Sequence, residues 1–124
     1  MKLRRGDLIW LSKDLEINLG KNVQDIDRPF VIISNNINNA KCPTVNIACL
    51  SKQVSKAKYP MHVFVEKQKY GLDYDGVIYT EQVLTVNKNK IREKIGSLDD
   101  EDLEKLNSAI YIQLIDENKV GFSR

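Results

Sequence analysis

The sequence holds little of the chemistry on which many enzymes and metalloproteins depend. Its 124 residues include one histidine, His62, and two cysteines, Cys42 and Cys49. A ribonuclease mechanism that needs two histidines in one chain is therefore excluded, and no spacing predicts a metal site or a disulfide. Gly-rich phosphate loops, dinucleotide fingerprints and G-x-S-x-G elbows are also missing. We expect two reduced thiols, no metal, no cofactor, and a structural or surface role for His62.

Long apolar runs and a strong charge imbalance are missing too. The longest apolar runs, such as residues 30–33, are far short of a membrane span, and MKLRRGDLIW lacks the apolar stretch of a secretory signal. A net charge of +2 is too small to predict nucleic-acid binding by itself. The composition, 42% hydrophobic and 29% charged, is typical of a soluble domain. We expect one cytoplasmic domain over residues 1–124 without membrane contact.

Short apolar runs separated by turn residues predict a mainly β fold. The expected strands are residues 8–11, 30–33, 44–50, 62–66, 77–86 and a short one around Gly96. Residues 77–86 form either one long strand or two strands broken by a bend. Phe30–Ile33 is apolar throughout, which is typical of a strand buried on both faces. Asp99 is a good helix N-cap, and leucines and isoleucines recur at helical spacing after it, so a helix is expected over residues 99–115. The pattern predicts a small antiparallel barrel or sandwich closed by one C-terminal helix.

Four segments lack the period of a helix or strand. Residues 12–27 predict a long flexible loop, which is either a flap with a role or a surface loop with none. Residues 34–41, with four asparagines, predict a turn, and residues 67–76 predict a loop rich in Gly, Asp and Tyr. Residues 121–124 are expected to form a tail.

One arginine and one serine flank the central strand–turn–strand stretch. Arg28 precedes the first apolar run, and Ser51 ends the second, so the stretch can bring them together at adjacent strand ends. A guanidinium matches phosphate oxygens, and a hydroxyl can donate to an oxygen on which charge builds. Tyr79, Glu81 and Gln82 add polar groups inside a strand. Each of these residues alone has an ordinary structural explanation, but together they predict a metal-free site for anion chemistry.

Five short stretches, taken in order, form a familiar pattern. They are Arg5-Gly6-Asp7, then R-P-F-V-I-I-S-N from Arg28, A-C-L-S ending at Ser51, Y-P-x-H-V from Tyr59, and G-V-I-Y-T-E-Q-V-L-T-V from Gly76. From about Arg5 to Leu114, the chain resembles the MazF/PemK family of toxin endoribonucleases. The resemblance implies a half-open, SH3-like β-barrel of the MazF/PemK/CcdB toxin type, which forms a homodimer.

The resemblance also implies an activity and partners. The expected reaction is metal-independent cleavage of single-stranded RNA at a short motif, leaving a 2′,3′-cyclic phosphate and a 5′-hydroxyl and stopping translation and growth. The expected partner is a MazE-like antitoxin whose flexible, often acidic tail occupies the RNA groove, in a complex that binds DNA. A tail of this kind competes with RNA for the same positive surface.

Individual roles follow from the matching positions. The resemblance implies that Arg28 is catalytic, and Ser51 stands where the family usually has a catalytic threonine. Glu81 and Gln82 match an acid–glutamine pair near the RNA, and Thr85 matches a threonine shortly after it. Because single-stranded RNA is held by stacking and backbone charge, three further substrate-binding candidates are Tyr79, Lys52 and Lys56.

The sequence departs from the family pattern at several of these positions. Ser51 keeps the hydroxyl but lacks the methyl group that stiffens threonine, which predicts slower turnover. Leu84 and Tyr79 stand where family members have arginines, and Asn87 replaces a usual aspartate. Two alternatives follow: a non-catalytic toxin of the same fold that acts on DNA gyrase, and a weakened relative that binds RNA or antitoxin without cutting.

Overall fold

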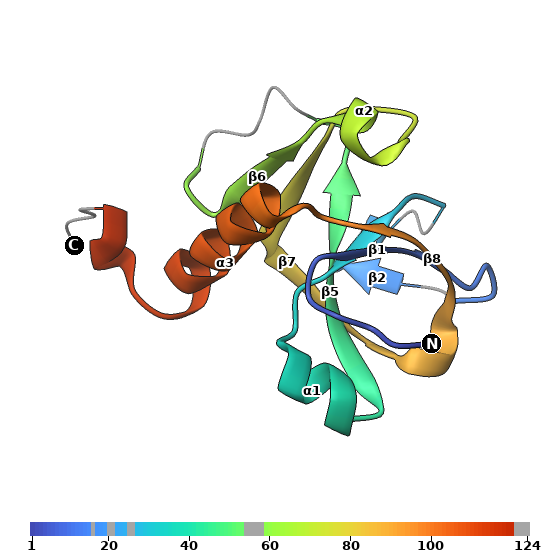
Figure 1. Ribbon diagram of the computed structural model, residues 1–124. Helices are drawn as coiled ribbons and strands as arrows, with labels where there is room; N and C mark the ends of the chain where they lie inside the picture. Colours follow the sequence, from blue (N-terminus) through green and yellow to red (C-terminus); the bar gives the residue numbers. More distant parts are fainter. Residues whose placement is uncertain (16, 20–21, 25–26, 54–58, 121–124) are drawn as a thin grey trace.

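A six-stranded antiparallel sheet forms the centre of the computed structural model, which describes residues 1–15, 17–19, 22–24, 27–53 and 59–120 (Figure 1). Its strand order is β6-β7-β5-β4-β1-β8. The strands are β1 (Asp7–Leu11), β4 (Phe30–Ile32), β5 (Thr44–Ser51), β6 (His62–Val65), β7 (Gly76–Asn87) and β8 (Ile91–Ser97). The edge strands β6 and β8 are not paired with each other, so the curled sheet stays open. The mainly β fold predicted from the sequence is confirmed.

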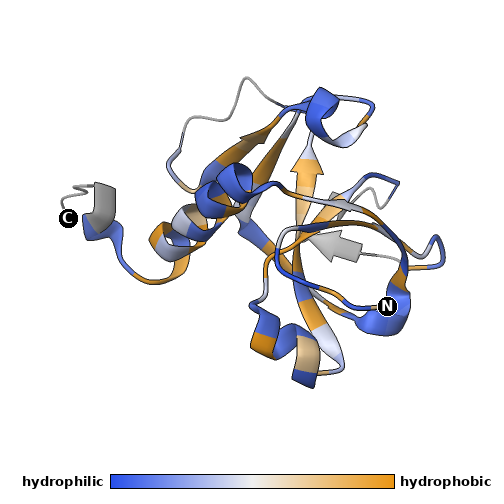
Figure 2. Ribbon diagram, in the orientation of Figure 1, coloured by the Kyte–Doolittle hydropathy of each residue, from blue (hydrophilic) through white to orange (hydrophobic). Residues whose placement is uncertain are grey.

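The central strands are buried on both faces because two apolar clusters lie on opposite sides of the sheet. In β5, Ala48 and Leu50 belong to one cluster, while Ile47 and Cys49 belong to the other. Alternation of side chains along a strand produces this division. We call the cluster with Leu50 the helix-side core, because it includes residues of the C-terminal helix, and the other the barrel-side core. Figure 2 shows the apolar stretches of β5 and β6 that supply these cores.

The predicted C-terminal helix is present as α3 (Asp100–Leu114), and it packs against β6 and β7 (Figure 1). Asp99 is its N-cap, and the Asp99 side chain accepts a hydrogen bond from the Asp102 amide. That bond, followed by the Lys69 ammonium, lowers the pKa of Asp99. Leu106, Ala109 and Ile110 are buried in the helix-side core. No helix among the described residues is long and apolar enough to cross a membrane.

The opening Arg5-Gly6-Asp7 holds the N-terminus to the sheet and to α3. The Arg5 side chain donates to the Ile33 carbonyl at 2.8 Å and to Asn107 of α3 at 3.1 Å. Gly6 has φ of 91°, and an added Cβ would meet Leu103 of α3 at 2.8 Å. The buried Asp7 carboxylate accepts from the Arg4 amide at 2.8 Å and from the Ser97 hydroxyl at 2.6 Å. Each residue of this motif therefore has an architectural role.

Two segments expected to lack regular structure contain helices. The Asn-rich stretch forms α1 (Asn36–Lys41), because the Asn35 side chain caps it by accepting from the Asn38 amide. The prediction of a simple turn there was wrong. The loop after β6 begins with α2 (Lys67–Tyr70), which ends at Gly71 in the left-handed conformation. The described residues also include the 3-10 helices η2 (Lys88–Lys90) and η3 (Glu117–Val120).

The predicted loop over residues 12–27 contains a second, two-stranded sheet. β2 (Ile17–Leu19) pairs antiparallel with β3 (Asn22–Gln24), so the segment is not structureless. Its flexibility stays a prediction. The expected tail, residues 121–124, lies outside the described residues.

Candidate functional site

The pairing of β4 with β5 brings Arg28 and Ser51 to adjacent strand ends. Phe30 is paired with Cys49, and the Leu50 amide donates to the Pro29 carbonyl at 3.1 Å. Continuing this antiparallel register by two residues places Arg28 opposite Ser51. The geometry predicted from the strand–turn–strand pattern is therefore present, although the catalytic roles of the two residues stay predictions.

Alternation also places these side chains on the same face of the sheet. Phe30 and Cys49 both belong to the barrel-side core, and Arg28 and Ser51 lie two positions further along their strands. The Arg28 guanidinium contacts the Cys49 sulfur, with 3.6 Å between Nη1 and Sγ. The Ser51 residue is 7% exposed, and its oxygen accepts from the Gln53 amide at 3.1 Å. This bond uses the oxygen as an acceptor, so the hydroxyl can still donate.

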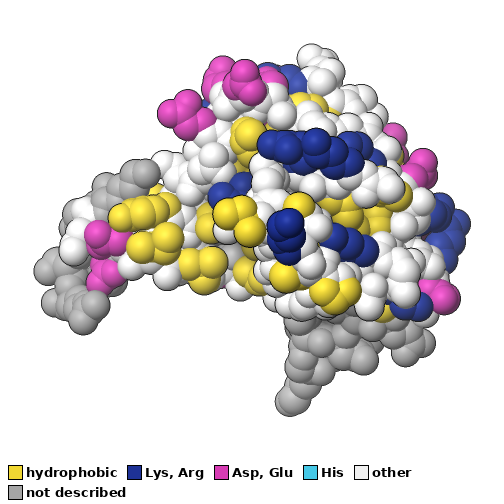
Figure 3. Space-filling model, turned by 60° about the horizontal axis from the view of Figure 1, so that its bottom comes forward, with side chains coloured by type: hydrophobic (Ala, Val, Ile, Leu, Met, Phe, Trp, Pro, Cys, Tyr) yellow, Lys and Arg dark blue, Asp and Glu magenta, His cyan; other side chains and the backbone are white. Residues whose placement is uncertain are grey.

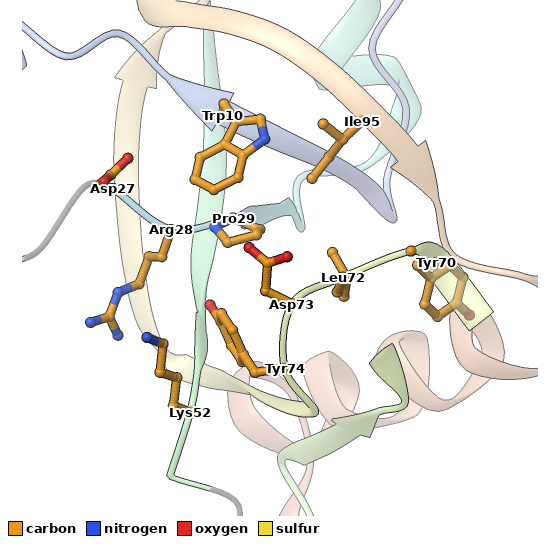
Figure 4. Close-up of a pocket in the computed structure, with 11 residues that line it drawn as sticks. Trp10, Asp27, Arg28, Pro29, Lys52, Tyr70, Leu72, Asp73, Tyr74 and Ile95 are labelled. Carbon is orange, nitrogen blue, oxygen red and sulfur yellow. The ribbon is translucent and has the colours of Figure 1, made fainter. Parts of the chain in front are cut away.

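A pocket of about 370 Å³ opens beside Arg28 (Figure 4). Arg28 and Lys52 stand at one side of it, with the Lys52 ammonium 5.1 Å from the centre of the Tyr74 ring. The other lining residues come from β1, the start of β4, β8 and the chain around α2: Trp10, Asp27, Pro29, Tyr70, Gly71, Leu72, Asp73, Tyr74 and Ile95. Two cations therefore border a hollow whose other lining is aromatic, apolar and, at Asp27 and Asp73, acidic. Its cationic side suits a ligand that is anionic at one end.

The pairing of β7 with β5 is irregular at the polar residues Tyr79, Glu81 and Gln82. Ala48 pairs with Val83 and Leu50 with Ile78, so four residues of β7, 79–82, face one residue of β5. Three residues of β7 thus have no partner in β5. Because successive side chains alternate between the two faces, an odd number of unpaired residues reverses which side chains of β7 face each core. Ile78 accordingly packs in the helix-side core, while Leu84 and Val86 pack on the barrel-side core.

Glu81 lies in this irregular stretch and is bound to His62. The closest distance from the His62 Nε2 atom to the Glu81 carboxylate is 2.8 Å. The His62 side chain is 5% exposed, and its ring packs against Tyr79 with centroids 4.5 Å apart. A structural position for His62 fits the expectation from its strand, but its contact with Glu81 was not predicted.

The remaining substrate-binding candidates have different surroundings. Tyr79 is 9% exposed and donates its hydroxyl to the Gln53 carbonyl, so its ring lacks the open face that stacking on RNA requires. Gln82 and Thr85 are exposed, and Thr85 accepts a hydrogen bond from Asn46 at 2.9 Å. Because Thr85 pairs with Asn46 and Val83 with Ala48, Thr85 lies on the helix-side face, opposite to Arg28. Lys56 lies outside the described residues.

Three residues of this region escaped the sequence analysis: Trp10, Asp73 and Tyr74. They occupy a strand end and a loop that become neighbours only because β1 and the α2 loop both border the β4–β5 end. The composition of the loop from Tyr70 to Gly76 could have indicated a binding loop, because aromatic and acidic residues are concentrated in it. In the described part of the chain, no group of three or more His, Cys, Asp or Glu side chains is placed to hold a metal ion.

Comparison with protein families gives a match over most of the chain. The model for the family described as PemK-like, MazF-like toxin of type II toxin–antitoxin system matches residues 4–114. An Endoribonuclease MazF from Staphylococcus saprophyticus is 44% identical over 112 residues, which cover 90% of this chain and 91% of that protein.

Solved structures share the fold at lower sequence identity. An endoribonuclease from a mycobacterial species has a TM-score of 0.68 at 18% identity, with 92% of each chain covered. MazF from Deinococcus radiodurans has a TM-score of 0.68 at 17% identity, covering 92% of this chain and 97% of that one. A mycobacterial endoribonuclease in complex with its cognate antitoxin has a TM-score of 0.64 at 20% identity, and the alignment covers 90% of this chain and 94% of that one. The half-open barrel expected from the sequence is confirmed by these likenesses.

The contact of His62 with Glu81 predicts which ring nitrogen carries the proton. We expect the neutral imidazole to be the Nε2–H tautomer, because Nε2 faces the carboxylate while Nδ1 is buried without a hydrogen-bond partner among the described residues. Long-range ¹⁵N–¹H correlation spectra above pH 8 will test this, and the single histidine of the chain removes any assignment problem.

The matched variant is Glu81→Ala, which removes the acceptor and should shift the tautomers toward a mixture. A dominant Nδ1–H form in the unaltered protein would contradict the arrangement.

Proposed function

Because this chain belongs to the family of PemK-like, MazF-like toxins of type II toxin–antitoxin systems, we propose that it cuts single-stranded RNA without a metal ion. The sequence relative that is 44% identical is an Endoribonuclease MazF, and the alignment covers nearly the whole of both chains. The structural observation that carries the proposal is the β4–β5 register, which brings Arg28 and Ser51 together beside a pocket bordered by a second cation, Lys52.

The proposed reaction uses a nucleophile from the RNA itself. The 2′-oxygen bonds to the adjacent phosphorus, and the bond from phosphorus to the 5′-oxygen breaks. The 2′-hydroxyl loses its proton, and the leaving 5′-oxygen gains one, so the products are a 2′,3′-cyclic phosphate and a 5′-hydroxyl. No water enters and no metal is required in this step. The phosphorane formed on the way carries extra negative charge on its non-bridging oxygens.

In this proposal, Arg28 and Ser51 stabilise that charge. A guanidinium remains protonated at all working pH values, so Arg28 acts as a fixed positive charge rather than as a general acid. The Ser51 hydroxyl donates to the same oxygens, since its own oxygen already accepts from the Gln53 amide. Glu81 is the candidate base by family position. Its contact with His62 holds its carboxylate in one orientation.

The biological role proposed is that of a growth-arresting toxin. Cleavage of messenger RNA stops translation, and a cognate antitoxin restores growth by covering the RNA site. The positive edge formed by Arg28 and Lys52 suits an acidic, flexible antitoxin segment as well as RNA. The two ligands would then compete for one surface.

Replacing Arg28 by alanine should reduce RNA cleavage by at least roughly a hundredfold, the usual cost of losing a preorganised group that stabilises an oxyanion. The measurement is the rate of cleavage of a defined RNA by purified protein with a chelator present. Arg4→Ala is the matched control, because Arg4 is an exposed arginine outside the pocket. Circular dichroism should be unchanged in both variants.

Sequencing of the RNA 5′ ends separates the alternatives. Chelator-resistant cuts at a short motif, lost in Arg28→Ala, support the proposal. Growth arrest with intact messenger RNA would favour the gyrase-directed toxin, and RNA binding without cuts would favour the weakened relative. Normal cleavage by Arg28→Ala would show that its role is misassigned.

Replacing Ser51 by alanine should slow cleavage roughly ten- to a hundredfold, the equivalent of one hydrogen bond to a charged group. Ser51→Thr should preserve or raise the rate, because the added methyl group restricts the hydroxyl to fewer rotamers. Single-turnover rates at saturating RNA isolate this step from binding. A threonine variant slower than the natural protein would mean that the buried site has adapted to serine.

We also propose that the chain works as a homodimer. Val83 is 37% exposed and Leu114 of α3 is 63% exposed, and both line a second hollow, of about 260 Å³. Ile115 beside Leu114 is exposed as well. Figure 3 shows hydrophobic side chains gathered over this end of α3. Exposed apolar groups that are continuous in this way are typical of a surface covered by a second copy.

Placing a carboxylate at this surface should therefore separate the copies. We expect Leu114→Asp to have the 14.2 kDa mass of one chain in light scattering, and the natural protein to have twice that mass. Phe64→Asp is the control, because Phe64 is an exposed apolar residue on β6 that does not line this hollow. A natural protein that is monomeric at micromolar concentration would refute the dimer.

A further inference from the structure

The pocket beside Arg28 has the shape and chemistry of a small binding site. Its volume of about 370 Å³ falls at the lower end of the range of roughly 300–1,000 Å³ that is typical of small-molecule sites. Figure 4 shows Arg28 and Lys52 at one side, with the rings of Trp10 and Tyr74 and the side chain of Pro29 further in. A ligand with a phosphate at the cations would therefore extend a planar, apolar group toward the aromatic residues.

The aromatic walls are fixed by contacts outside the pocket. The Tyr74 hydroxyl donates to the Leu50 carbonyl at 2.8 Å, which ties the loop to β5. The Arg92 guanidinium of β8 lies 5.6 Å from the centre of the Trp10 ring. At the start of α2, the Lys67 amide donates to Asp75 at 2.9 Å, which closes the base of the loop. A ligand would not have to order these rings, so less affinity would be lost on binding.

Two carboxylates line this space, those of Asp27 and of Asp73, and Asp73 is an exposed residue. In Figure 4 the Asp73 side chain extends from the α2 loop toward Pro29 and Trp10. Within the described part of the chain, Asp73 has no hydrogen bond or ion pair, in contrast with Asp75 and Asp99, which both bind backbone amides. An ionised carboxylate can only accept hydrogen bonds, so the complementary group is a donor.

We propose that this pocket binds one nucleobase adjacent to the scissile phosphate, and that Asp73 selects a base with an exocyclic amino group over uracil. The proposal rests on the RNA-cleaving function above and names a determinant of its sequence preference. Adenine, cytosine and guanine each present an amino donor, which a carboxylate accepts. Uracil places a carbonyl oxygen at the equivalent position, and its one donor on this edge, N3–H, lies between two carbonyl oxygens. A carboxylate that faces uracil therefore meets an acceptor beside any donor it binds, which is unfavourable. The aromatic rings supply stacking, which every base accepts.

Trp10 makes the pocket directly observable. It is the only tryptophan of the chain, so intrinsic fluorescence reports on this one position. The probes are short homopolymers of 2′-O-methyl RNA, which cannot be cut because the attacking hydroxyl is blocked. We expect the adenine and cytosine homopolymers to quench Trp10 at concentrations roughly five- to tenfold lower than the uracil homopolymer, the discrimination expected of one base contact.

The key variant is Asp73→Asn, which removes the charge and adds a donor that uracil can accept. The difference between the uracil and cytosine homopolymers should then largely disappear, while total binding remains. Asp100→Asn is the control, since Asp100 is an exposed acid of α3 outside the pocket and should leave the ratio unchanged. In parallel, end mapping on a randomised RNA should show relaxed preference at one position of the cut motif only for Asp73→Asn.

These experiments can refute the base-pocket proposal and the RNA-cleavage proposal separately. Unchanged Trp10 fluorescence at saturating RNA, in a protein that still cuts, would overturn the base pocket and leave the proposed function standing. Equal quenching by all homopolymers, or an unaltered motif in Asp73→Asn, would overturn the selection by Asp73. A protein that shows the predicted quenching but cuts no RNA would refute the nuclease and support the pocket.

Discussion

The hydrogen bond from the Leu50 amide to the Pro29 carbonyl fixes the place at which two strands end together. The register of two antiparallel strands can shift only by whole residues. A shift of one residue would place the Arg28 and Ser51 side chains on different faces of the sheet. Two apolar cores prevent that slip, because β4 and β5 carry fully buried side chains on both faces and every one of them would be misplaced. The position of the proposed catalytic pair is thus a consequence of core packing. Neither residue needs a strong direct bond to the other.

The fold elements that depend on local patterns were the ones that the sequence could predict. The N-cap of α3 and its buried Leu106, Ala109 and Ile110 lie within one short segment, and the apolar runs of β1, β4 and β5 are each continuous in the sequence. The Asn-rich stretch was misjudged, since asparagine favours turns and helix caps through the same side-chain acceptor. Asn35 acts as a cap here, and the helix that follows is held by the Asn38 side chain donating to the Thr44 carbonyl. That contact joins segments whose relation the local sequence does not encode.

The candidate site was only partly predictable for a similar reason. The positions of Arg28 and Ser51 can be predicted from a strand–turn–strand pattern. The positions of the polar residues of β7 depend instead on how many residues of that strand stand opposite Cys49. The three unmatched residues reverse the faces, expose Glu81 and Gln82, and send Thr85 to the side away from Arg28. The sequence allowed a break in this strand, but a period-two pattern cannot give the number of unmatched residues, because both halves of the strand alternate correctly on their own. Glu81, which contacts His62, lies in the same irregular stretch.

The helix at the end of the chain stabilises the pocket at a distance. Tyr70, which lines the pocket, donates its hydroxyl to the buried Asp102 carboxylate of α3, and the same hydroxyl accepts from the Asp99 amide at 3.1 Å. Burial and this carboxylate raise the pKa of Tyr70, so the phenol keeps the proton that it donates. Lys69 adds an ion pair to Asp99 at 3.0 Å. The loop that carries Asp73 and Tyr74 is therefore held from α3 at one end and from β5 at the other. Substitutions of Asp99 or Asp102, the two acids that bind Tyr70 and Lys69, can therefore alter base preference without contacting RNA, because they release the wall on which Asp73 stands.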